Sequence, residues 1–510
     1  MDQLNYAMRI DVYTHYVKAT KFDTMGKTAL FEFAIAQGIR GWKPIGRGKS
    51  VQCITSIFAA ATKDRSEFRF HINHFEALKR HLIAHDIGPN KIEFVQHGEY
   101  IPAIANFVKI SDKSLFDYQV PLHEYFIAPG KTKVVTLQTG KGKTMLFLES
   151  VYKIQKRVIL IIRPKFIDKW ILDFREMFKE TDTSLAVIRG GGPLSNMLQA
   201  CVDGTFDVDF TIISNKTYQL WLKDYEHTRG QSGEYPLNPD MLCEATKAGV
   251  IAVDEVHLDF HLNYKMDLYT HGAKSMNMSA TLVSGNPKIT EMYQVKFPKL
   301  ERSPEIEYDK YIAVSALSYT LLSQKGMRYK RSMGYSHTAY EESIMKDKER
   351  LRNYLSMIAG ITKTTYVNRM VTGQKMLIFA STVEMCTLIT KFIEPMFPDQ
   401  KVNRYVGEDD YSDLHTADIV VSTIQSAGTA VDVDGLWIVL MTDSIDSIQS
   451  NLQVLGRLRK MKGKFLGITP EFYYLFCNQV EKQVQYHMNK LEHFSGRVIG
   501  HRTLLTSYKV

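Results

Sequence analysis

The feature that most constrains the fold is a series of short apolar runs separated by stretches of helical pattern. The first series contains KVVTL (133–137), RVILII (157–162), FTIIS (210–214) and GVIAV (249–253). A second series follows after residue 310, with KMLIFAS (375–381), ADIVVST (417–423) and LWIVLM (436–441). Strands that are apolar on both faces are typical of a parallel sheet covered by helices on each side. The sequence therefore predicts two α/β units in series.

The length of the chain indicates more than these two units. A chain of 510 residues is too long for one core and is expected to form about three domains. We place their limits at 1–112, 113–305 and 306–510. The C-terminal stretch 478–494 has the pattern of an amphipathic helix packed on the last domain.

The first segment has the pattern of a small mixed α/β domain. A strand-like run, MRIDVYTHYVKAT, is followed by RGWKPIGRGKS, which we interpret as a basic loop. A helix is then expected to begin near Asn73, because Asn73 and Glu76 have capping-box spacing, and to end at IGPN (87–90).

Composition and charge favour some classes of protein and exclude others. The net charge of +9 and the isoelectric point near 9.0 favour a polyanionic partner, most simply nucleic acid. No stretch reaches the ~20 apolar residues of a membrane span, and the N-terminus lacks the basic start and apolar run of a signal peptide. We therefore expect a soluble, cytoplasmic protein with no membrane partner.

The cysteines and histidines give no clear metal centre. The five cysteines form no CxxC pair and are expected to be reduced core residues. His74, His81 and His85 could share one face of a helix, and His257 and His261 are four residues apart. No cysteine or further carboxylate completes either set, so we interpret both as ordinary polar-face histidines.

The segment TGKGKT (139–144) lies between a predicted strand and a helical stretch, where a phosphate-binding loop belongs. Its two glycines would let backbone N–H groups turn inward on an anion, and the helix N-terminus adds a partial positive charge. Lys143 would reach the β and γ phosphates of ATP, and the Thr144 hydroxyl would bind Mg²⁺. The usual pattern has a glycine where this chain has Leu137, so a purely structural turn stays open as the alternative.

A pair of carboxylates follows the last strand of the first series. GVIAVDEVHLDF places Asp254 and Glu255 at the end of an apolar run. Two carboxylates there are costly unless a cation or a polar substrate meets them. Asp254 could hold the Mg²⁺ shell while Glu255 orients an attacking water. The alternative is a strand that simply runs into an acidic loop.

Two further stretches complete the set of motifs. NMSATL contains Ser279 and Thr281, which carry little information alone. NLQVLGRLRK places Gln453, Arg457 and Arg459 on one helical stretch of the second unit, where guanidinium groups could reach a γ-phosphate across a cleft. An exposed basic helix is the alternative.

The order of these elements resembles superfamily 2 helicases of the DExH type, and most of all the phage UvsW-type branch-migration helicases. The resemblance covers about residues 110–460 and extends more loosely over the N-terminal segment. In that family the phosphate loop reads T-G-x-G-K-T without the earlier glycine. The resemblance therefore implies that TGKGKT is a phosphate cradle, and that the fold is two RecA-like domains in tandem with a small N-terminal α/β domain that binds duplex DNA.

The resemblance also assigns roles to individual residues. LFDYQ matches the adenine-reading segment, so Gln119 is expected to recognise the base, and VDEVH is motif II. The ATP-binding residues that it implies are Gln119, Thr139, Gly140, Lys141, Gly142, Lys143 and Thr144. The catalytic residues that it implies are Asp254, Glu255, Gln453, Arg457 and Arg459, with Mg²⁺ held by Thr144 and Asp254. The residues expected to couple the site to the other domain are His257, Ser279, Thr281 and Gly428.

Other segments match motifs that contact nucleic acid. RPKF is expected to lie along a strand through Pro164 and Lys165, and ISNKTY places Thr217 on a phosphate. In VSTIQSAGTAVD, which looks like motif V, Thr423 is expected to contact a strand and Gly428 to form a turn. In the N-terminal domain we expect Arg47 and Lys49 of GRGKS to contact duplex DNA.

The chain departs from the family pattern at two points. Motif VI normally reads Q-x-x-G-R-x-x-R, but the last position here is Lys460, with an arginine one residue earlier at Arg459. The identity of the arginine finger is therefore open, and we favour Arg457 together with Arg459. Motif V normally has an aspartate two residues after its glycine, where this chain has Ala430; Asp432 is expected to substitute.

The resemblance implies an ATP-dependent DNA helicase or translocase that unwinds or branch-migrates forks, junctions and R-loops in phage replication and recombination. Its partners would be branched, duplex and single-stranded DNA, with RNA in hybrids, and the protein would act as a monomer in the host cytoplasm. One alternative is an RNA or origin-binding helicase that remodels nucleoprotein without branch migration. Another is a nucleic-acid-binding module with an idle site, against which intact Lys143, Asp254 and Glu255 argue.

Overall fold

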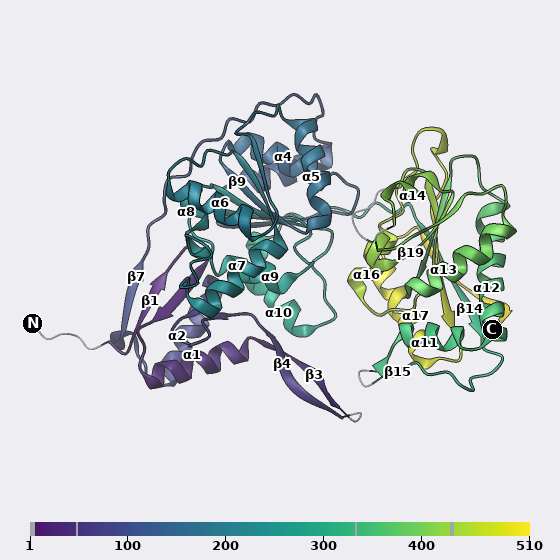
Figure 1. The fold of residues 1–510 in the computed structure, drawn as a ribbon, viewed down its shortest axis with the longest axis horizontal. Helices are drawn as coiled ribbons and strands as arrows, with labels where there is room; N and C mark the ends of the chain where they lie inside the picture. The colour runs from purple at the N-terminus through teal and green to yellow at the C-terminus, as the bar shows by residue number, and fades with distance from the viewer. Residues whose placement is uncertain (1–5, 47–48, 332–333, 408, 429–432) are drawn as a thin grey trace, which may run out of the picture.

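The computed structural model describes residues 6–46, 49–331, 334–407, 409–428 and 433–510. Three large sheets divide the described chain (Figure 1). We call the part around the first sheet the N-terminal unit, the part around the second sheet the first lobe, and the part around the third sheet the second lobe. The domain limits given above, 1–112, 113–305 and 306–510, stay a prediction.

The N-terminal unit is a mixed sheet with two helices; the sequence predicts a mixed α/β unit but only the second of these helices. Only β1 and β7 run parallel, and the other neighbours are antiparallel. Across the sheet the strands are β5 (Ala60–Ala61), β6 (Phe68–His71), β2 (Tyr16–Thr20), β1 (Met8–Val12) and β7 (Ile92–Gln96). Leu30 of α1 (Thr24–Ala36) and Leu82 of α2 (Phe75–Ala84) are buried with Phe70 of β6 in one core.

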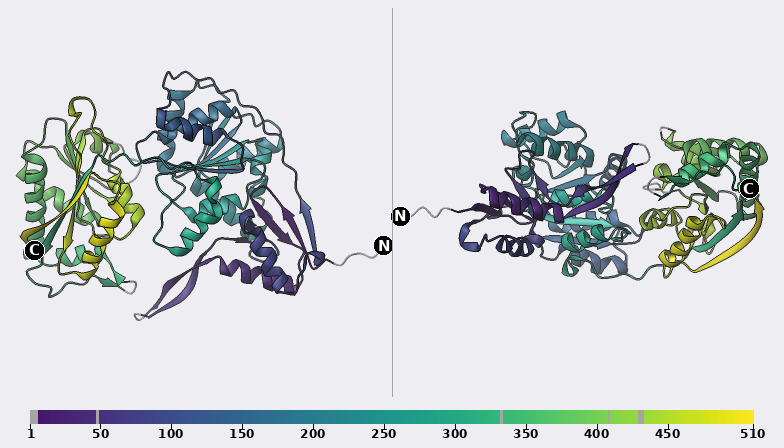
Figure 2. Two further views of the ribbon diagram at one scale, coloured as in Figure 1. Left: turned by 180° about the vertical axis from the view of Figure 1, so that it is seen from behind. Right: turned by 90° about the horizontal axis from the view of Figure 1, so that it is seen from below.

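Two local predictions for this unit are wrong. The capping box at Asn73 does not form, because the Asn73 amide donates to the Val295 carbonyl 2.7 Å away, and α2 begins after a 3-10 turn that ends at His74. The predicted basic loop is instead an antiparallel hairpin, β3 (Gly38–Gly46) and β4 (Lys49–Ile57). In Figures 1 and 2 this hairpin projects from the unit toward the second lobe.

The first lobe is built on a fully parallel six-stranded sheet. Its strands, in order across the sheet, are β10 (Leu185–Ile188), β11 (Phe210–Ser214), β9 (Val158–Ile162), β12 (Val250–Val253), β13 (Lys274–Ser279) and β8 (Thr132–Thr136). Every residue of β9, β11 and β12 is buried, as a sheet covered on both faces requires. The covering helices are α3 (Val120–Ile127), α4 (Lys143–Ile154), α5 (Pro164–Met177), α6 (Gly191–Val202), α7 (Asn215–Thr228), α8 (Leu242–Ala245), α9 (Phe260–Asp267) and α10 (Pro287–Lys296).

The second lobe repeats this design with seven parallel strands. In order they are β18 (Val402–Tyr405), β19 (Ile419–Thr423), β17 (Lys375–Ala380), β20 (Leu436–Met441), β21 (Glu471–Cys477), β14 (Ala313–Thr320) and β22 (Gly500–Lys509). A short hairpin, β15 (Lys330–Arg331) and β16 (Gly334–Tyr335), stands apart from the sheet. The helices are α11 (His337–Met345), α12 (Lys348–Thr362), α13 (Val383–Ile393), α14 (Tyr411–Thr416), α15 (Ile424–Ala427), α16 (Ile448–Leu455) and α17 (Glu481–Phe494).

The prediction of an α/β fold with two parallel-sheet units is confirmed. The strands expected from the apolar runs form at their predicted positions, and α17 forms within the stretch predicted as a C-terminal helix. Within the described ranges, no helix combines the length and the apolar character that crossing a membrane requires.

Buried ion pairs join the N-terminal unit to the first lobe. Asp267 of α9 pairs with Lys296 of α10, and both side chains are fully buried. His71 of β6 reaches the same carboxylate at 3.4 Å, so the pair lies on the seam between the two parts. Burial opposes ionisation of Asp267, but the Lys296 ammonium, His71 and His15 together outweigh burial and hold the pKa of that carboxyl well below its ordinary value. A second seam contact joins Arg69 to Asp240 at 2.7 Å.

Removing one member of the buried pair should destabilise this seam strongly. Lys296→Met leaves the Asp267 carboxylate buried without its cation, and we expect a loss of about 3–5 kcal/mol in denaturant unfolding of the full chain. The double variant with Asp267→Asn should recover part of that loss. The control is Lys288→Met on the same helix, whose pair with Glu291 is partly exposed and should be worth under about 1 kcal/mol. An equal, small effect of both lysine variants would contradict a structural role for the pair.

Candidate functional site

The phosphate loop runs from the end of β8 to the start of α4 at Lys143. Gly140 and Gly142 both have left-handed backbones, with φ of +83° and +74°. A Cβ atom at Gly140 would lie 2.6 Å from the Nε of Arg459, and one at Gly142 would lie 2.7 Å from the Nε2 of Gln119. Both positions therefore favour glycine for backbone conformation, and the Arg459 and Gln119 side chains would have to move to admit a Cβ.

Lys143 meets the carboxylate pair that follows β12. The Lys143 ammonium lies 2.9 Å from the Glu255 carboxylate, and both side chains are largely buried. Asp254 accepts hydrogen bonds from the Trp170 indole at 3.1 Å and from the Glu255 backbone N–H at 2.9 Å. The predicted phosphate loop and the predicted acidic motif thus form one site.

The two carboxyls differ in their electrostatic environment. Burial and the neighbouring Glu255 raise the pKa of Asp254 well above its ordinary value. Burial acts the same way on Glu255, but the Lys143 ammonium, His257 and the Ala280 backbone N–H together outweigh it and lower the pKa of that carboxyl. Lys143 acts on Asp254 as well but does not offset its burial, and a divalent metal is the group that a buried carboxylate beside a phosphate loop fits. Thr144, the other predicted Mg²⁺ ligand, lies close to Asp173 of α5, and its hydroxyl partly offsets the burial that raises the pKa of that carboxyl.

Residues from outside the loop brace it. The Gln119 amide donates to the carbonyls of Lys141 and Gly142 at 2.9 and 3.1 Å, so it fixes the loop backbone in this structure; its predicted adenine contact stays a prediction. The Lys141 ammonium pairs at 2.7 Å with Asp309, which lies in the segment leading to the second lobe. Gln138 also bonds the Asp309 backbone, through both its amide nitrogen and its amide oxygen.

His257 connects the acidic motif to the second lobe. Ser279 donates its only hydroxyl proton to the Thr281 carbonyl at 2.6 Å, so at the 2.7 Å contact between them His257 Nδ1 must donate to Ser279. The His257 Nε2 then keeps its lone pair and accepts from the Gln453 amide at 2.7 Å, across the boundary between the lobes. Burial lowers the pKa of His257 to about 4, which keeps the ring neutral at pH 7.

The turn after α16 in the second lobe packs against the phosphate loop. A Cβ at Gly456 would lie 3.2 Å from the Thr139 hydroxyl, and the Arg459 side chain lies against Gly140. Arg457 is buried and contacts the Gln453 carbonyl at 3.4 Å, and its charge acts on Lys165. Of the two arginines proposed as the finger, Arg459 is therefore the one at the phosphate loop, and Arg457 faces the predicted strand-binding segment.

A cavity of about 590 Å³ opens beside the loop, between the lobes. Phe116 and Tyr118, whose rings stack at 5.5 Å and within 8° of parallel, form part of its wall. The other residues that matter here are Thr139, Gly140, Lys141, Asp309 and Arg459. An aromatic wall next to a phosphate loop suits a heterocyclic base attached to a phosphate chain.

A second cavity, of about 750 Å³, lies where all three parts of the chain approach one another. It is lined by Ile39, Ser56 and Phe58 at the root of the hairpin, by Arg163, Pro164, Lys165 and Lys216 of the first lobe, and by Gln449 of the second. Burial, with the nearby guanidinium groups of Arg163 and Arg457, lowers the pKa of Lys165 to about 8. Asp259 lines the same cavity and already pairs with Arg163 at 2.7 Å, so the remaining excess of positive charge is what an anion such as a phosphodiester would complement.

The remaining predicted nucleic-acid residues lie in different settings. Thr217 is buried and its hydroxyl accepts from the Gly190 N–H at 2.8 Å. Thr423 caps α15 by accepting from the Ser426 N–H at 3.3 Å. Gly428 ends α15, where a Cβ would lie 2.2 Å from the Ile424 carbonyl, so the turn requires glycine. Their predicted strand contacts stay predictions.

Four predicted residues cannot be placed. Arg47, Ala430 and Asp432 lie outside the described residues, and the side chain of Lys49 is also not described. The sequence reasoning also missed partners that only the fold brings to the site: Trp170, Asp173, Asp309 and the Phe116–Tyr118 wall. The aromatic pair was visible in LFDYQ, but no local pattern marks the other three.

No protein-family model and no curated protein sequence matches the chain. Solved structures do match it. A variant of S. cerevisiae Dbp5 bound to RNA and ADP BeF3 has a TM-score of 0.51 over 76% of this chain and 90% of that chain, at 9% identity. Mss116p bound to ssRNA and AMP-PNP has a TM-score of 0.50 over 77% of this chain and 75% of that chain, at 13% identity. The chain has the fold of tandem RecA-like domains. At identities this low, the structural matches establish a shared fold alone.

The environment of His257 predicts its titration. The pKa of His257 is about 4 in the folded chain and 6.5 in the unfolded chain. As the pH falls, His257 is therefore protonated in the unfolded chain at a higher pH than in the folded chain. Stability from this group is therefore present above pH 6.5 and is lost as the pH falls toward 4. Nitrogen-15 NMR of the imidazoles, assigned with His257→Gln, should show a neutral ring protonated on Nδ1 at pH 7. A midpoint near 6.5 would contradict the buried cross-lobe hydrogen bond.

Proposed function

We propose that this protein is an ATP-dependent DNA helicase or translocase that acts on branched DNA, with ATP bound between the two lobes. In this proposal the first domain, residues 1–112, binds duplex DNA, residues 113–305 bind ATP, and residues 306–510 complete the motor. The observation that carries it is the convergence on Gly140 of a phosphate loop from one lobe and Arg459 from the other. Such a site exists only when the lobes are together, so hydrolysis can be coupled to their relative movement.

The chemistry follows from the residues at the loop. The Lys143–Glu255 ion pair holds an ammonium and a carboxylate ready without a nucleotide, and an incoming triphosphate would draw Lys143 away from Glu255. Glu255, released from that pair, would orient the attacking water. Mg²⁺, held by Asp254 and Thr144, would screen the phosphate charge. Arg459 would stabilise charge on the γ-phosphate from the second lobe.

The proposed DNA path runs through the cavity at the hairpin root. Its cations come from the first lobe, and the hairpin adds an apolar wall from the N-terminal unit. Contacts made by Arg and Lys to phosphates are weakly sequence-selective and sensitive to salt, as a translocase requires. The resemblance to UvsW-type helicases and the net charge of +9 support DNA with forks, junctions or R-loops as the substrate.

An RNA or nucleoprotein-remodelling helicase is the second candidate. The structures with a similar fold, Dbp5 and Mss116p, are described as bound to RNA and ssRNA. The two candidates predict the same ATP site and different nucleic-acid responses.

Hydrolysis should depend on Lys143 and Glu255 and should respond most to branched DNA. We expect Lys143→Ala to lower the ATPase rate at least about a hundredfold, and Glu255→Gln to lower it about 10²–10⁴-fold while ATP binding persists. Lys153→Ala, an exposed lysine on the same helix, is the matched control. The assay compares a four-way junction, a fork, linear duplex, single-stranded DNA and RNA, each with strand displacement measured in parallel.

The outcomes separate the parts of the proposal. ATPase activity that survives Lys143→Ala would show that the site is misplaced. Activity that depends on Lys143 but responds to RNA as much as to branched DNA would keep the motor and favour the second candidate.

The two arginines should have different effects. Arg459→Ala should lower the ATPase rate about 10³-fold, the low end of the range for an arginine finger, with nucleotide affinity nearly retained. Arg457→Ala should act mainly on nucleic-acid affinity, because its charge acts on Lys165. Lys482→Ala, an exposed lysine on α17 of the same lobe, is the control. A larger loss of ATPase rate in Arg457→Ala than in Arg459→Ala would reverse the assignment.

A further inference from the structure

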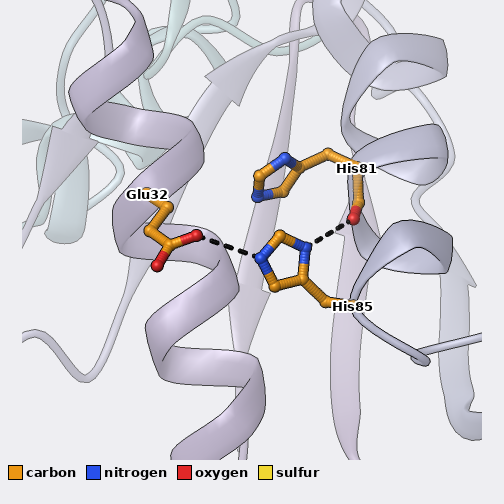
Figure 3. A group of neighbouring side chains, drawn as sticks. All are labelled: Glu32, His81 and His85. Atoms are coloured by element: carbon orange, nitrogen blue, oxygen red, sulfur yellow. Dashed lines mark hydrogen bonds and ion pairs between the residues drawn. The ribbon is translucent and has the colours of Figure 1, made fainter.

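Three potential metal ligands meet between the two helices of the N-terminal unit (Figure 3). Glu32 lies on α1, while His81 and His85 lie four residues apart at the end of α2, so both imidazoles face α1. One ligand atom from each residue lies within 4.8 Å of those of the other two. The sequence reasoning found no carboxylate to complete this histidine group, because Glu32 is about fifty residues away and only the packing of α1 against α2 supplies it. His74 does not belong to the group: it is buried and contacts Tyr264.

Each imidazole has one nitrogen held by a backbone carbonyl. The His85 Nδ1 lies 2.9 Å from the His81 carbonyl, and the His81 Nε2 lies 2.9 Å from the Ala29 carbonyl. Histidine ligands of metals make this contact through the nitrogen that does not bind the metal, which fixes the ring and its tautomer. The His85 Nε2 is thereby left facing Glu32. His81 would bind a metal through Nδ1, or through Nε2 if that nitrogen gives up the Ala29 carbonyl.

The contact between His85 and Glu32 requires a positive charge. The His85 Nε2 and a Glu32 carboxylate oxygen are 3.0 Å apart, and a neutral ring protonated on Nδ1 would direct a lone pair at that oxygen. Without a metal, both contacts of His85 are hydrogen bonds only if each ring nitrogen carries a proton. A metal ion bound to both groups would replace the proton on Nε2. Ligands of one Zn²⁺ lie roughly 3.3 Å apart, close to the separation of these two atoms.

We propose that Glu32, His81 and His85 form a binding site for a divalent transition metal of the Zn²⁺ class, with water completing the coordination. Two nitrogens and one carboxylate oxygen suit Zn²⁺, Co²⁺ or Ni²⁺ better than Mg²⁺, which prefers oxygen ligands. Two histidines four residues apart on a helix face are a recurrent chelating pair. The proposal is independent of the ATP site, and it makes a metal the clamp between α1 and α2.

The position of this clamp gives it a structural effect. α1 ends at Ala36 and the hairpin begins at Gly38, so tying α1 to α2 would fix the root of the hairpin. The three ligands are exposed or half-buried, so a metal can enter from solvent without opening the core.

The test uses the full chain, freed of metal with a chelator and kept in excess Mg²⁺ to saturate magnesium sites. Calorimetric titration with Zn²⁺ should give one equivalent per chain, and Co²⁺ should give visible bands of nitrogen and oxygen coordination without a thiolate charge-transfer band. Glu32→Gln and His85→Gln should each weaken binding about tenfold or more. Glu32 is exposed, so its variant tests the site without disturbing the fold. His227→Gln, an exposed histidine on α7, should leave binding unchanged.

Three results would overturn the proposal. They are the absence of stoichiometric Zn²⁺ binding, binding that survives either ligand variant unchanged, and a thiolate band showing that the free cysteines hold the metal instead. In the first case Glu32 and His85 form only a salt bridge.

Discussion

The ion pair between Lys143 and Glu255 is the interaction on which the candidate site depends. It joins the N-terminus of α4 to the end of β12. The strand that precedes α4, β8, is separated from β12 on the sheet by β13. A lysine at the start of a helix adds its charge to the partial positive charge of the helix N-terminus and of the inward-facing N–H groups of the loop. This excess of positive charge favours a nearby anion. The Glu255 carboxylate supplies that anion from within the protein. Both groups are therefore in position before any phosphate arrives, which is the preorganisation that phosphoryl chemistry needs.

The loop itself is held by parts of the chain that are distant in sequence. Gln119 braces its backbone from one side, Asp309 pairs with Lys141 from the segment between the lobes, and Arg459 lies on Gly140 from the second lobe. The left-handed backbone at Gly140 and Gly142 is what favours glycine at these two positions. The neighbouring atoms belong to the distal parts of Arg459 and Gln119, which are flexible side chains.

Much of the fold was predictable from sequence because its signals are local. Runs such as RVILII have too few polar residues for a half-exposed strand, and the prediction of parallel sheets followed from that alone. The lysine and carboxylates of the site were found because each follows a predicted strand. Contacts between distant segments could not be found in this way. Asp309, Trp170 and Glu32 carry no local pattern, and the hairpin at residues 38–57 was mistaken for a loop because its glycines and charges mask the alternation of a strand.

The buried charges between β6, α9 and α10 have a mechanical consequence. A seam that contains a lysine, an aspartate and a histidine with no access to water resists sliding. Any separation would expose one of these charges or leave it buried without its partner. The N-terminal unit is thus held rigidly against the first lobe, and its long hairpin is fixed to that half of the molecule. In the proposed motor, movement of the second lobe relative to the first lobe would therefore also change its position relative to this hairpin.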